Sequence, residues 1–232
     1  EKVLVFTATY NEVENVEKLI KLIFSNKKKI NVLVVDDNSP DKTYEVLKKL
    51  KKKYKGIYLI KRSAKLGLDT AHKLAFKFAR KRKFEKLITM DADLSHNPKL
   101  IKKFIDSLDQ FEFVIGSRYA KGGSCEVGLF RYLLSFFGNK LIKYLTKIPS
   151  NEFTTSFRGF NLKKLKKFDL KIVSSKGYSF FMETIFQLNR KGFKIHEIPI
   201  HFKDREAGTS KIPKIEIFRT LKNLFLLVIF NK

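Results

Sequence analysis

Two aspartates separated by one residue, Asp91 and Asp93, directly follow Lys86–Met90, a short run that predicts a buried strand. Residues two apart on an extended backbone point to the same side. Two carboxylates about 4 Å apart repel each other by roughly 4 kcal/mol at an effective dielectric of 20, and a divalent cation removes this cost. Mg²⁺ and Mn²⁺ prefer oxygen ligands, and Mg²⁺ is usually held by one or two carboxylates together with substrate phosphates. The pair therefore indicates a metal that holds a nucleotide diphosphate.

A capped turn is the simpler interpretation of the same residues. Asp93 or Asn97 would then only cap the helix that is expected to open at Pro98. An isolated pair of aspartates favours this capped turn. The metal interpretation depends on the polar clusters found elsewhere in the chain.

Short apolar runs alternate with helical patterns in the first half of the chain, which predicts an α/β fold with a mainly parallel central sheet and flanking helices. The expected strands are Val3–Thr7, Asn31–Asp36, Ile57–Lys61, Lys86–Met90 and Phe113–Gly116, and the expected helices lie near Val13–Phe24, Lys42–Tyr54, Leu68–Lys81 and Lys99–Asp109. Ligands of such sheets bind beyond the carboxyl ends of the strands. Polar clusters at residues 9–12, 36–39 and 91–93 follow three of these strands. One shared site explains them better than three unrelated turns.

The second half of the chain has a less regular pattern. Gly122 and Gly123 predict a flexible loop, and further elements are expected at Leu129–Leu145 and Tyr178–Arg190 (helices) and at Lys194–Pro199 and Ile200–Lys203 (strands). Because no repeat or flexible linker interrupts the pattern, residues 1–211 are expected to form one catalytic domain.

Residues 212–232 are expected to form a C-terminal amphipathic helix, from about Lys214 to Phe230. Its apolar end, Leu224–Phe230, covers only about 10 Å as a helix and is too short to cross a bilayer. Basic residues precede it, namely Lys211, Lys214, Arg219 and Lys222. A helix of this kind is expected to lie at a membrane surface or against a membrane partner. Packing on the core of the domain is the alternative.

The composition points to a folded protein with an anionic partner. The chain has 232 residues, of which 44% are hydrophobic, and a formal net charge of +26. This charge suits nucleic acid, an acidic membrane face or phosphorylated substrates. Cys125 is the only cysteine, which fits a reducing compartment, and no signal peptide is visible. We expect a peripheral protein on the cytoplasmic face of a membrane.

An ordered series of motifs extends through most of the chain. Its members are Ala8–Glu12 with Asn15, Val34–Asp41, Lys65–Leu68 with Thr70 and Ala71, Met90–His96, Gly116–Tyr119 with Gly122 and Gly123, Arg131 with Ser135 and Asn139, Thr154 with Ser156–Arg158, Lys176–Phe180 with Glu183, Glu197–Ile200, and Phe202 with Asp204, Arg205, Gly208, Ser210 and Lys211. The series resembles glycosyltransferase family 2, and within it the dolichyl-phosphate mannosyltransferases and their bacterial polyprenyl-phosphate relatives.

The resemblance implies a Rossmann-like, nucleotide-sugar-binding fold of the GT-A type that uses Mg²⁺ or Mn²⁺. It also implies a GDP-mannose donor, a lipid-linked phosphate acceptor and, in some lineages, a small membrane subunit. It assigns Asp91 and Asp93 to the metal, with Asp93 as the direct ligand. The residues it assigns to the nucleotide sugar are Thr9, Tyr10, Glu12, Asp37, Asp91, Ala92 and Asp93.

The implied reaction needs positioning more than it needs a strong base, because a lipid phosphate is already anionic at neutral pH. Arginine neutralises and orients such a group by bidentate contact. The residues expected to act in catalysis are Asp93, Arg118, Arg131 and Arg205, and those expected at the acceptor phosphate are Arg118, Arg131, Ser135, Arg205 and Lys211. Arg131 and Ser135 are four residues apart and share a helix face. Surface ion pairing is an equally good interpretation of Arg118 and Arg131.

Several residues depart from the family pattern. Glu152 stands where relatives have Asp, and Asp69 where they have Gly; each is unfavourable near a diphosphate unless it points away or is paired. Glu183 is expected to face the substrate or to be structural, and His96 and His201 to be structural. The alternative functions are a polyprenyl-phosphate glucosyltransferase that uses UDP-glucose and a non-enzymatic nucleic-acid-binding protein. No nucleic-acid-binding module with stacking aromatics is recognisable, so nucleic acid is not an expected partner.

Overall fold

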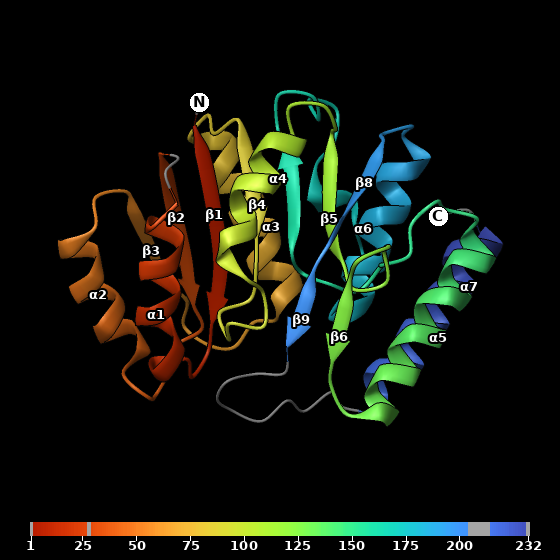
Figure 1. Ribbon diagram of the computed structural model, residues 1–232, viewed down its shortest axis with the longest axis horizontal. Helices are drawn as coiled ribbons and strands as arrows, with labels where there is room; N and C mark the ends of the chain where they lie inside the picture. Colours follow the sequence, from red (N-terminus) through yellow and green to blue (C-terminus); the bar gives the residue numbers. More distant parts are fainter. Residues whose placement is uncertain (1, 27–28, 204–213, 231–232) are drawn as a thin grey trace.

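A seven-stranded sheet lies between two layers of helices in the computed structural model, which describes residues 2–26, 29–203 and 214–230 (Figure 1). The strands, in the spatial order β3-β2-β1-β4-β7-β5-β8, are β3 Ile57–Lys61, β2 Ile30–Asp36, β1 Val3–Thr9, β4 Lys86–Thr89, β7 Arg158–Asn161, β5 Phe113–Ser117 and β8 Ile195–Pro199. Only β7 is antiparallel to its neighbours, β4 and β5. The expected mainly parallel sheet is therefore confirmed.

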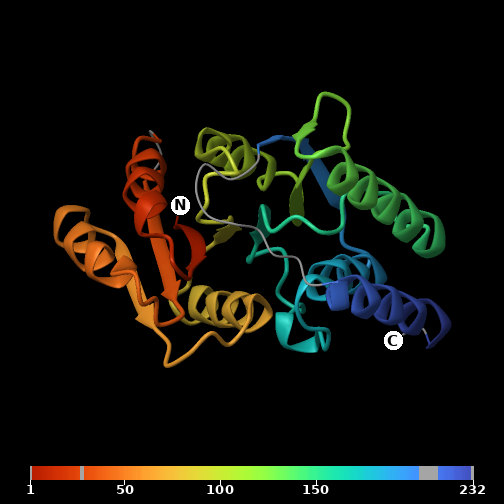
Figure 2. The same cartoon turned by 90° about the horizontal axis from the view of Figure 1, so that it is seen from below.

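Helices cover both faces of this sheet. They are α1 Val13–Phe24, α2 Thr43–Lys53, α3 Leu68–Lys81, α4 Ile101–Ser107, α5 Leu129–Thr146, α6 Tyr178–Arg190 and α7 Lys214–Phe230, with short 3-10 turns at Pro98–Leu100 and Leu170–Ile172. Buried residues of α1, α2 and α4 pack on one face, and those of α3 and α6 pack on the other. Figure 2 looks onto the edge where β1 and β2 end and shows the two helix layers on either side.

Two local expectations are corrected by the structure. The expected flexible loop at Gly122 and Gly123 is a tight turn, closed by a hydrogen bond from the Gly123 N–H to the Ala120 carbonyl. A Cβ on Gly123 would lie 2.7 Å from the carbonyl oxygens of Ser117 and Arg118, so the turn requires glycine. The chain then forms β6 Ser124–Glu126, which pairs in parallel with β9 His201–Lys203. The expected helix over Lys99–Asp109 is shorter, because the 3-10 turn that starts at Pro98 precedes α4.

Helices α5 and α7 lie side by side beyond the β8 edge of the sheet (Figures 1 and 2). Leu224 and Leu227 of α7 are buried in the core, whereas Phe225 and Ile229 are exposed. One side of the helix therefore packs on the domain, as the alternative interpretation predicts, and a membrane or partner contact of the exposed side stays a prediction. Within the described ranges, no helix has both the length and the apolar character that a bilayer crossing demands.

Candidate active site

Hydrogen bonds join the polar clusters that follow β1 and β2. The Thr9 hydroxyl donates to Asp36 Oδ2 over 2.9 Å, and the Ser39 hydroxyl donates to the same oxygen over 2.6 Å. The Asn11 N–H donates to Ser39 Oγ over 3.1 Å. Two clusters that are far apart in sequence thus form one connected edge, as parallel strands predict.

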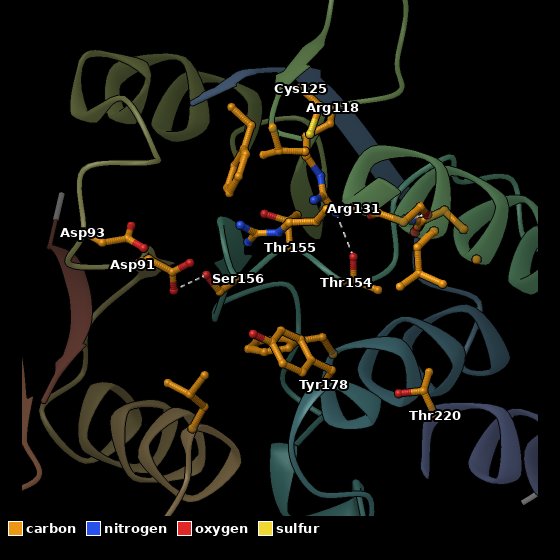
Figure 3. A pocket seen from close by; sticks show the side chains of 18 of the residues that line it. Asp91, Asp93, Arg118, Cys125, Arg131, Thr154, Thr155, Ser156, Tyr178 and Thr220 are labelled. Carbon is orange, nitrogen blue, oxygen red and sulfur yellow. Dashed lines mark hydrogen bonds between the residues drawn. The ribbon is translucent and has the colours of Figure 1, made fainter. Parts of the chain in front are cut away.

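A cavity of about 910 Å³ opens at this edge and continues between α5 and α7. All of the residues expected at the nucleotide sugar line it: Thr9, Tyr10, Glu12, Asp37, Asp91, Ala92 and Asp93. Arg118, Arg131 and Ser135, expected at the acceptor phosphate, line it too. Figure 3 shows Arg131 reaching in from α5, with Asp91 and Asp93 on the opposite side. The other two expected acceptor residues, Arg205 and Lys211, lie outside the described residues.

Each carboxylate of the aspartate pair is held by a serine. The Ser156 hydroxyl donates to Asp91 Oδ1 over 2.6 Å, and the Ser95 hydroxyl donates to Asp93 Oδ1 over 2.6 Å. Asp93 is 5% exposed, and its Oδ1 also accepts the Ser95 N–H. Asp93 therefore caps its own turn, whereas the 3-10 turn that follows is capped by Asn97.

The donor set around these aspartates fits a hard divalent cation. In the part of the chain that the structure describes, no three or more His, Cys, Asp or Glu side chains cluster as ligands. A cation held here would take Asp91 and Asp93 from the protein and its remaining ligands from diphosphate and water. This is the ligand set in which Mg²⁺ is usually bound.

His96 holds the backbone of the aspartate motif through a hydrogen bond. Its ring is buried, and Nδ1 accepts the backbone N–H of Asp91 over 3.1 Å. This bond requires the tautomer with its proton on Nε2, which lies 3.3 Å from the Thr155 hydroxyl. Burial lowers the pKa of His96, so the ring stays neutral and the bond is kept near pH 7. His96 thus has the structural role expected from the sequence.

An arginine that the sequence analysis missed holds Asp37. Arg62 donates from Nε and Nη2 to the two carboxylate oxygens of Asp37, and from Nη2 to the Gly67 carbonyl. This pair joins the end of β2 to the loop before α3. Nearby, the Lys65 ammonium lies 4.5 Å from the ring centre of Tyr10, so a cation and an aromatic face line the same end of the cavity. No motif distinguished Arg62, because its partner is 25 residues away in the sequence.

Arg118 follows β5 and is paired with Glu152. Its Nε and Nη2 lie 2.7 and 2.8 Å from the two oxygens of Glu152, whose side chain is fully buried. Burial alone would raise the pKa of Glu152, but Arg118 holds it below the ordinary value. Arg118 is thus both ion-paired and at the cavity, and the unusual Glu152 is neutralised.

The two other carboxylates discussed for the site turn away from the cavity. Asp69 Oδ1 accepts the Gly177 N–H over 3.4 Å. Glu183 is buried and accepts the backbone N–H groups of Ser174 and Ser175 over 3.0 and 2.7 Å. These contacts assign Glu183 a structural role.

Apolar side chains of α5 and α7 form the far end of the cavity, and the sequence analysis did not anticipate those of α5. The lining includes Phe130, Leu133, Leu134, Phe137 and Leu141 of α5 and Leu221 and Leu224 of α7. A signal was present in the sequence, since apolar residues occur on most sides of Leu129–Thr146, which is unusual for a surface helix. The cavity therefore joins an acidic end at the strand termini to an apolar end between two helices, with Arg118 and Arg131 among its lining.

Comparison with known proteins agrees with this architecture. The sequence profile of glycosyl transferase family 2 matches residues 4–169. A polyprenol monophosphomannose synthase of Mycolicibacterium smegmatis is 33% identical over 215 residues, which cover 91% of this chain and 81% of the relative. An undecaprenyl-phosphate mannosyltransferase of Micrococcus luteus is 31% identical over 212 residues, which cover 91% of this chain and 87% of the relative.

Solved structures share the fold. Glucosyl-3-phosphoglycerate synthase from Mycobacterium tuberculosis, in complex with Mn²⁺, UDP and glucosyl-3-phosphoglycerate, superimposes with a TM-score of 0.69 at 13% identity, covering 98% of this chain and 80% of the other. A mannosyltransferase from Pyrobaculum calidifontis, in complex with GDP-Man and Mn²⁺, superimposes with a TM-score of 0.63 at 16% identity, covering 100% of this chain and 65% of the other.

These findings, together with the carboxylate pair at the strand ends, define the class of protein as a glycosyltransferase of the GT-A type. The chain belongs to glycosyl transferase family 2.

Proposed function

We propose that this protein transfers mannose from GDP-mannose to a dolichyl or other polyprenyl phosphate, with inversion at the sugar carbon. The observation that carries the proposal is the shape of the cavity. A carboxylate pair suited to a nucleotide sugar and an apolar end suited to an isoprenoid chain share one cavity, with Arg131 among its lining. The mannosyltransferases of Mycolicibacterium smegmatis and Micrococcus luteus described above support this choice of sugar and acceptor.

The proposed reaction needs no proton transfer from the acceptor. An oxygen of the lipid phosphate attacks the anomeric carbon from the face opposite the diphosphate. A carbon–oxygen bond to the acceptor forms while the bond to the diphosphate breaks, and the diphosphate leaves with the electron pair. Arg131 orients the acceptor phosphate in this proposal, with Ser135 one turn along the same helix. Arg205 and Lys211, which lie outside the described residues, stay predicted partners of this phosphate.

Mg²⁺ or Mn²⁺ is the proposed cofactor. A bound divalent ion supplies stabilisation of the negative charge on the departing diphosphate. Asp91 and Asp93 would hold it, and their serine partners keep both carboxylates turned to the same part of the cavity. The metal-bound complexes of proteins with the same fold support this assignment.

A membrane surface is the proposed site of action, on the cytoplasmic face. Helix α5 exposes large apolar residues along its length, including Leu129 (73%), Phe130 (82%) and Phe137 (60%), and α7 exposes Phe225 and Ile229. Burying such residues in the headgroup and acyl boundary is favourable by about 25 cal/mol per Å² of apolar surface. The apolar end of the cavity opens between these helices, where a membrane-embedded lipid could enter. A small membrane subunit stays a prediction.

A comparison of GDP with UDP binding tests which nucleotide sugar is the donor. We expect GDP, with Mn²⁺, to raise the melting temperature of the protein by several degrees, and UDP to raise it less at the same concentration. Without metal, the effect of GDP should fall sharply. A larger effect of UDP would favour the glucosyltransferase alternative.

A further inference from the structure

One buried carboxylate, Glu152, lies between the two halves of the site. Oε2 accepts from Nε of Arg118, and Oε1 accepts from Nη2 of Arg118. Oε1 also accepts from the backbone N–H and the hydroxyl of Thr154, and from the N–H of Thr155, over 2.9 to 3.3 Å. A single side chain thus binds an arginine that follows β5 and the backbone turn at 154–155 that precedes β7.

These bonds determine what Arg118 can offer to a ligand. Arginine has five N–H groups. Nε and one N–H of Nη2 donate to Glu152, and Nη2 also donates to the Thr154 hydroxyl. The fork that would bind a phosphate in a bidentate manner is therefore already engaged by a carboxylate. Within the described residues, these bonds leave Nη1 to be turned towards a group in the cavity, and the Cys125 thiol also lies within hydrogen-bond reach of the guanidinium.

The turn held by Glu152 continues to the aspartate pair. Ser156 donates to Asp91 Oδ1, and the Thr155 hydroxyl lies 3.3 Å from Nε2 of His96, whose other ring nitrogen accepts the Asp91 N–H. Two short routes thus connect Glu152 to Asp91 through the same three-residue turn. Displacing the Glu152 side chain would alter the spacing between Arg118 and the aspartate pair.

We propose that Glu152 is a positioning residue, which sets the distance and direction between Arg118 and Asp91 and so aligns the acceptor phosphate with the sugar carbon. This inference rests on the proposed function. Glu152 also neutralises Arg118, because the two side chains form a buried pair at 2.7 Å. Misplacing a reacting group by about 1 Å can cost about a hundredfold in rate.

Glu152→Gln tests this in the full chain. The amide keeps the size of the side chain but removes its charge and turns an NH₂ group towards the donors of Arg118. We expect the KM for a polyprenyl phosphate to rise about tenfold or more, because a buried pair is broken next to the acceptor. The affinity for GDP with Mn²⁺ should stay within about threefold, since the aspartates keep their serine partners. Glu152→Asp keeps the charge, so its KM for the polyprenyl phosphate should lie much closer to the wild-type value than that of Glu152→Gln.

Glu197→Gln is the matched control. Glu197 of β8 also holds this loop, because its carboxylate accepts the N–H groups of Asn151 and Glu152 over 2.7 and 3.1 Å. Among the described residues, no hydrogen bond joins Glu197 to Arg118. A merely structural role for Glu152 predicts that both glutamine variants lower the melting temperature and change the two affinities in parallel. A selective rise in the acceptor KM for Glu152→Gln alone supports positioning; parallel changes overturn it.

Two further outcomes also decide between the inference and its alternatives. If Glu152→Gln does not fold, Thr154→Val takes its place, because it removes the hydroxyl that binds both Glu152 Oε1 and Arg118 Nη2. An acceptor KM that stays unchanged in Thr154→Val overturns the inference. A wild-type protein that binds GDP with Mn²⁺ but transfers nothing to a polyprenyl phosphate contradicts the proposed function, before any variant is compared.

Discussion

Serine hydroxyl groups hold the two carboxylates that are proposed to bind the metal. Asp91 is held by Ser156, which is 65 residues further along the chain, and Asp93 by Ser95 of its own turn. Such charge-assisted hydrogen bonds are stronger than neutral ones and restrict the rotation of the side chain. The carboxylates are thus oriented before any ligand binds, which lowers the cost of assembling a metal site.

Arg131 should serve the acceptor rather than the donor. Arg131→Gln removes a cation that lines the cavity from α5, so we expect the KM for the lipid phosphate to rise about tenfold or more. Binding of GDP with Mn²⁺, followed by calorimetry, should change by less than about threefold. Lys140→Gln, on the same helix, is the control. Equal losses for donor and acceptor would move Arg131 to the donor side.

The buried His72 should make stability depend on pH. Its ring packs edge-on against Phe6 and Phe181, and burial lowers its pKa to about 3 from an ordinary value of 6.5. Because the unfolded chain binds a proton more readily, this contribution is present above about pH 6.5 and is lost as the pH falls towards 3. Between pH 7 and pH 5 the loss amounts to about 2 kcal/mol.

His72→Phe should remove this part of the pH dependence. Urea unfolding at pH 7 and pH 5 measures it, and the exposed His201→Gln is the control. An unchanged difference between the two pH values in His72→Phe would mean that other groups, such as the buried His96, carry the effect.

The sequence predicts where the site lies better than it predicts which side chains form ion pairs within it. Asp91 and Asp93 are recognisable because two carboxylates at a spacing of two follow an apolar run, which is a local property of the sequence. In the structure β4 ends at Thr89, and the pair lies in the turn that follows. The partners Arg62–Asp37 and Arg118–Glu152 are 25 and 34 residues apart, and only the fold brings them together. For the same reason, the sequence did not reveal that Glu152 already accepts from the two N–H groups with which Arg118 was expected to bind the acceptor phosphate.

At the scale of elements, the long helices and most of the strands were predictable from the sequence, whereas β6 and β7 were not. The bounds of α1, α3, α6 and α7 agree with the sequence prediction. Helix α1 has a clear apolar periodicity, and a glycine directly precedes α3 and α6. Strand β7 has four residues, Arg158–Asn161, and no alternating pattern. It is a strand because β4 and β5 lie on both sides of it, which is tertiary context rather than local propensity.

The exposed surface of α5 should bind membranes. Replacing Phe130 and Phe137 with Ser removes two large, exposed apolar side chains, and we expect the share of protein that sediments with liposomes to fall several-fold. The fold should persist, because neither side chain is in the core. Ile172→Ser, an exposed apolar residue away from α5 and α7, is the control. Equal binding by the double variant would place the membrane contact elsewhere.

At the scale of the whole molecule, positive charge and exposed apolar surface are expected to contribute together to membrane binding. The net charge is +26, and basic residues lie on the same two helices as the apolar ones, with Lys140 and Lys143 on α5 and Arg219 and Lys222 on α7. Each Lys or Arg near an anionic membrane contributes about 1 kcal/mol, which salt screens. Binding to vesicles with anionic lipid should therefore weaken as salt rises from about 0.05 to 0.5 M. Binding that does not change with salt would contradict an electrostatic contribution.

Transfer of the sugar is the most direct test of the whole account. Purified protein is incubated with GDP-mannose labelled in the sugar, a polyprenyl phosphate and Mn²⁺, and label is counted in the organic phase; UDP-glucose replaces GDP-mannose in a parallel reaction. The account predicts that mannose enters the lipid fraction, that chelation of the metal stops the reaction, and that Asp93→Asn lowers the rate by about a hundredfold or more while the protein stays folded. Lipid-linked glucose in place of mannose, or an Asp93→Asn variant with near wild-type turnover, would contradict it.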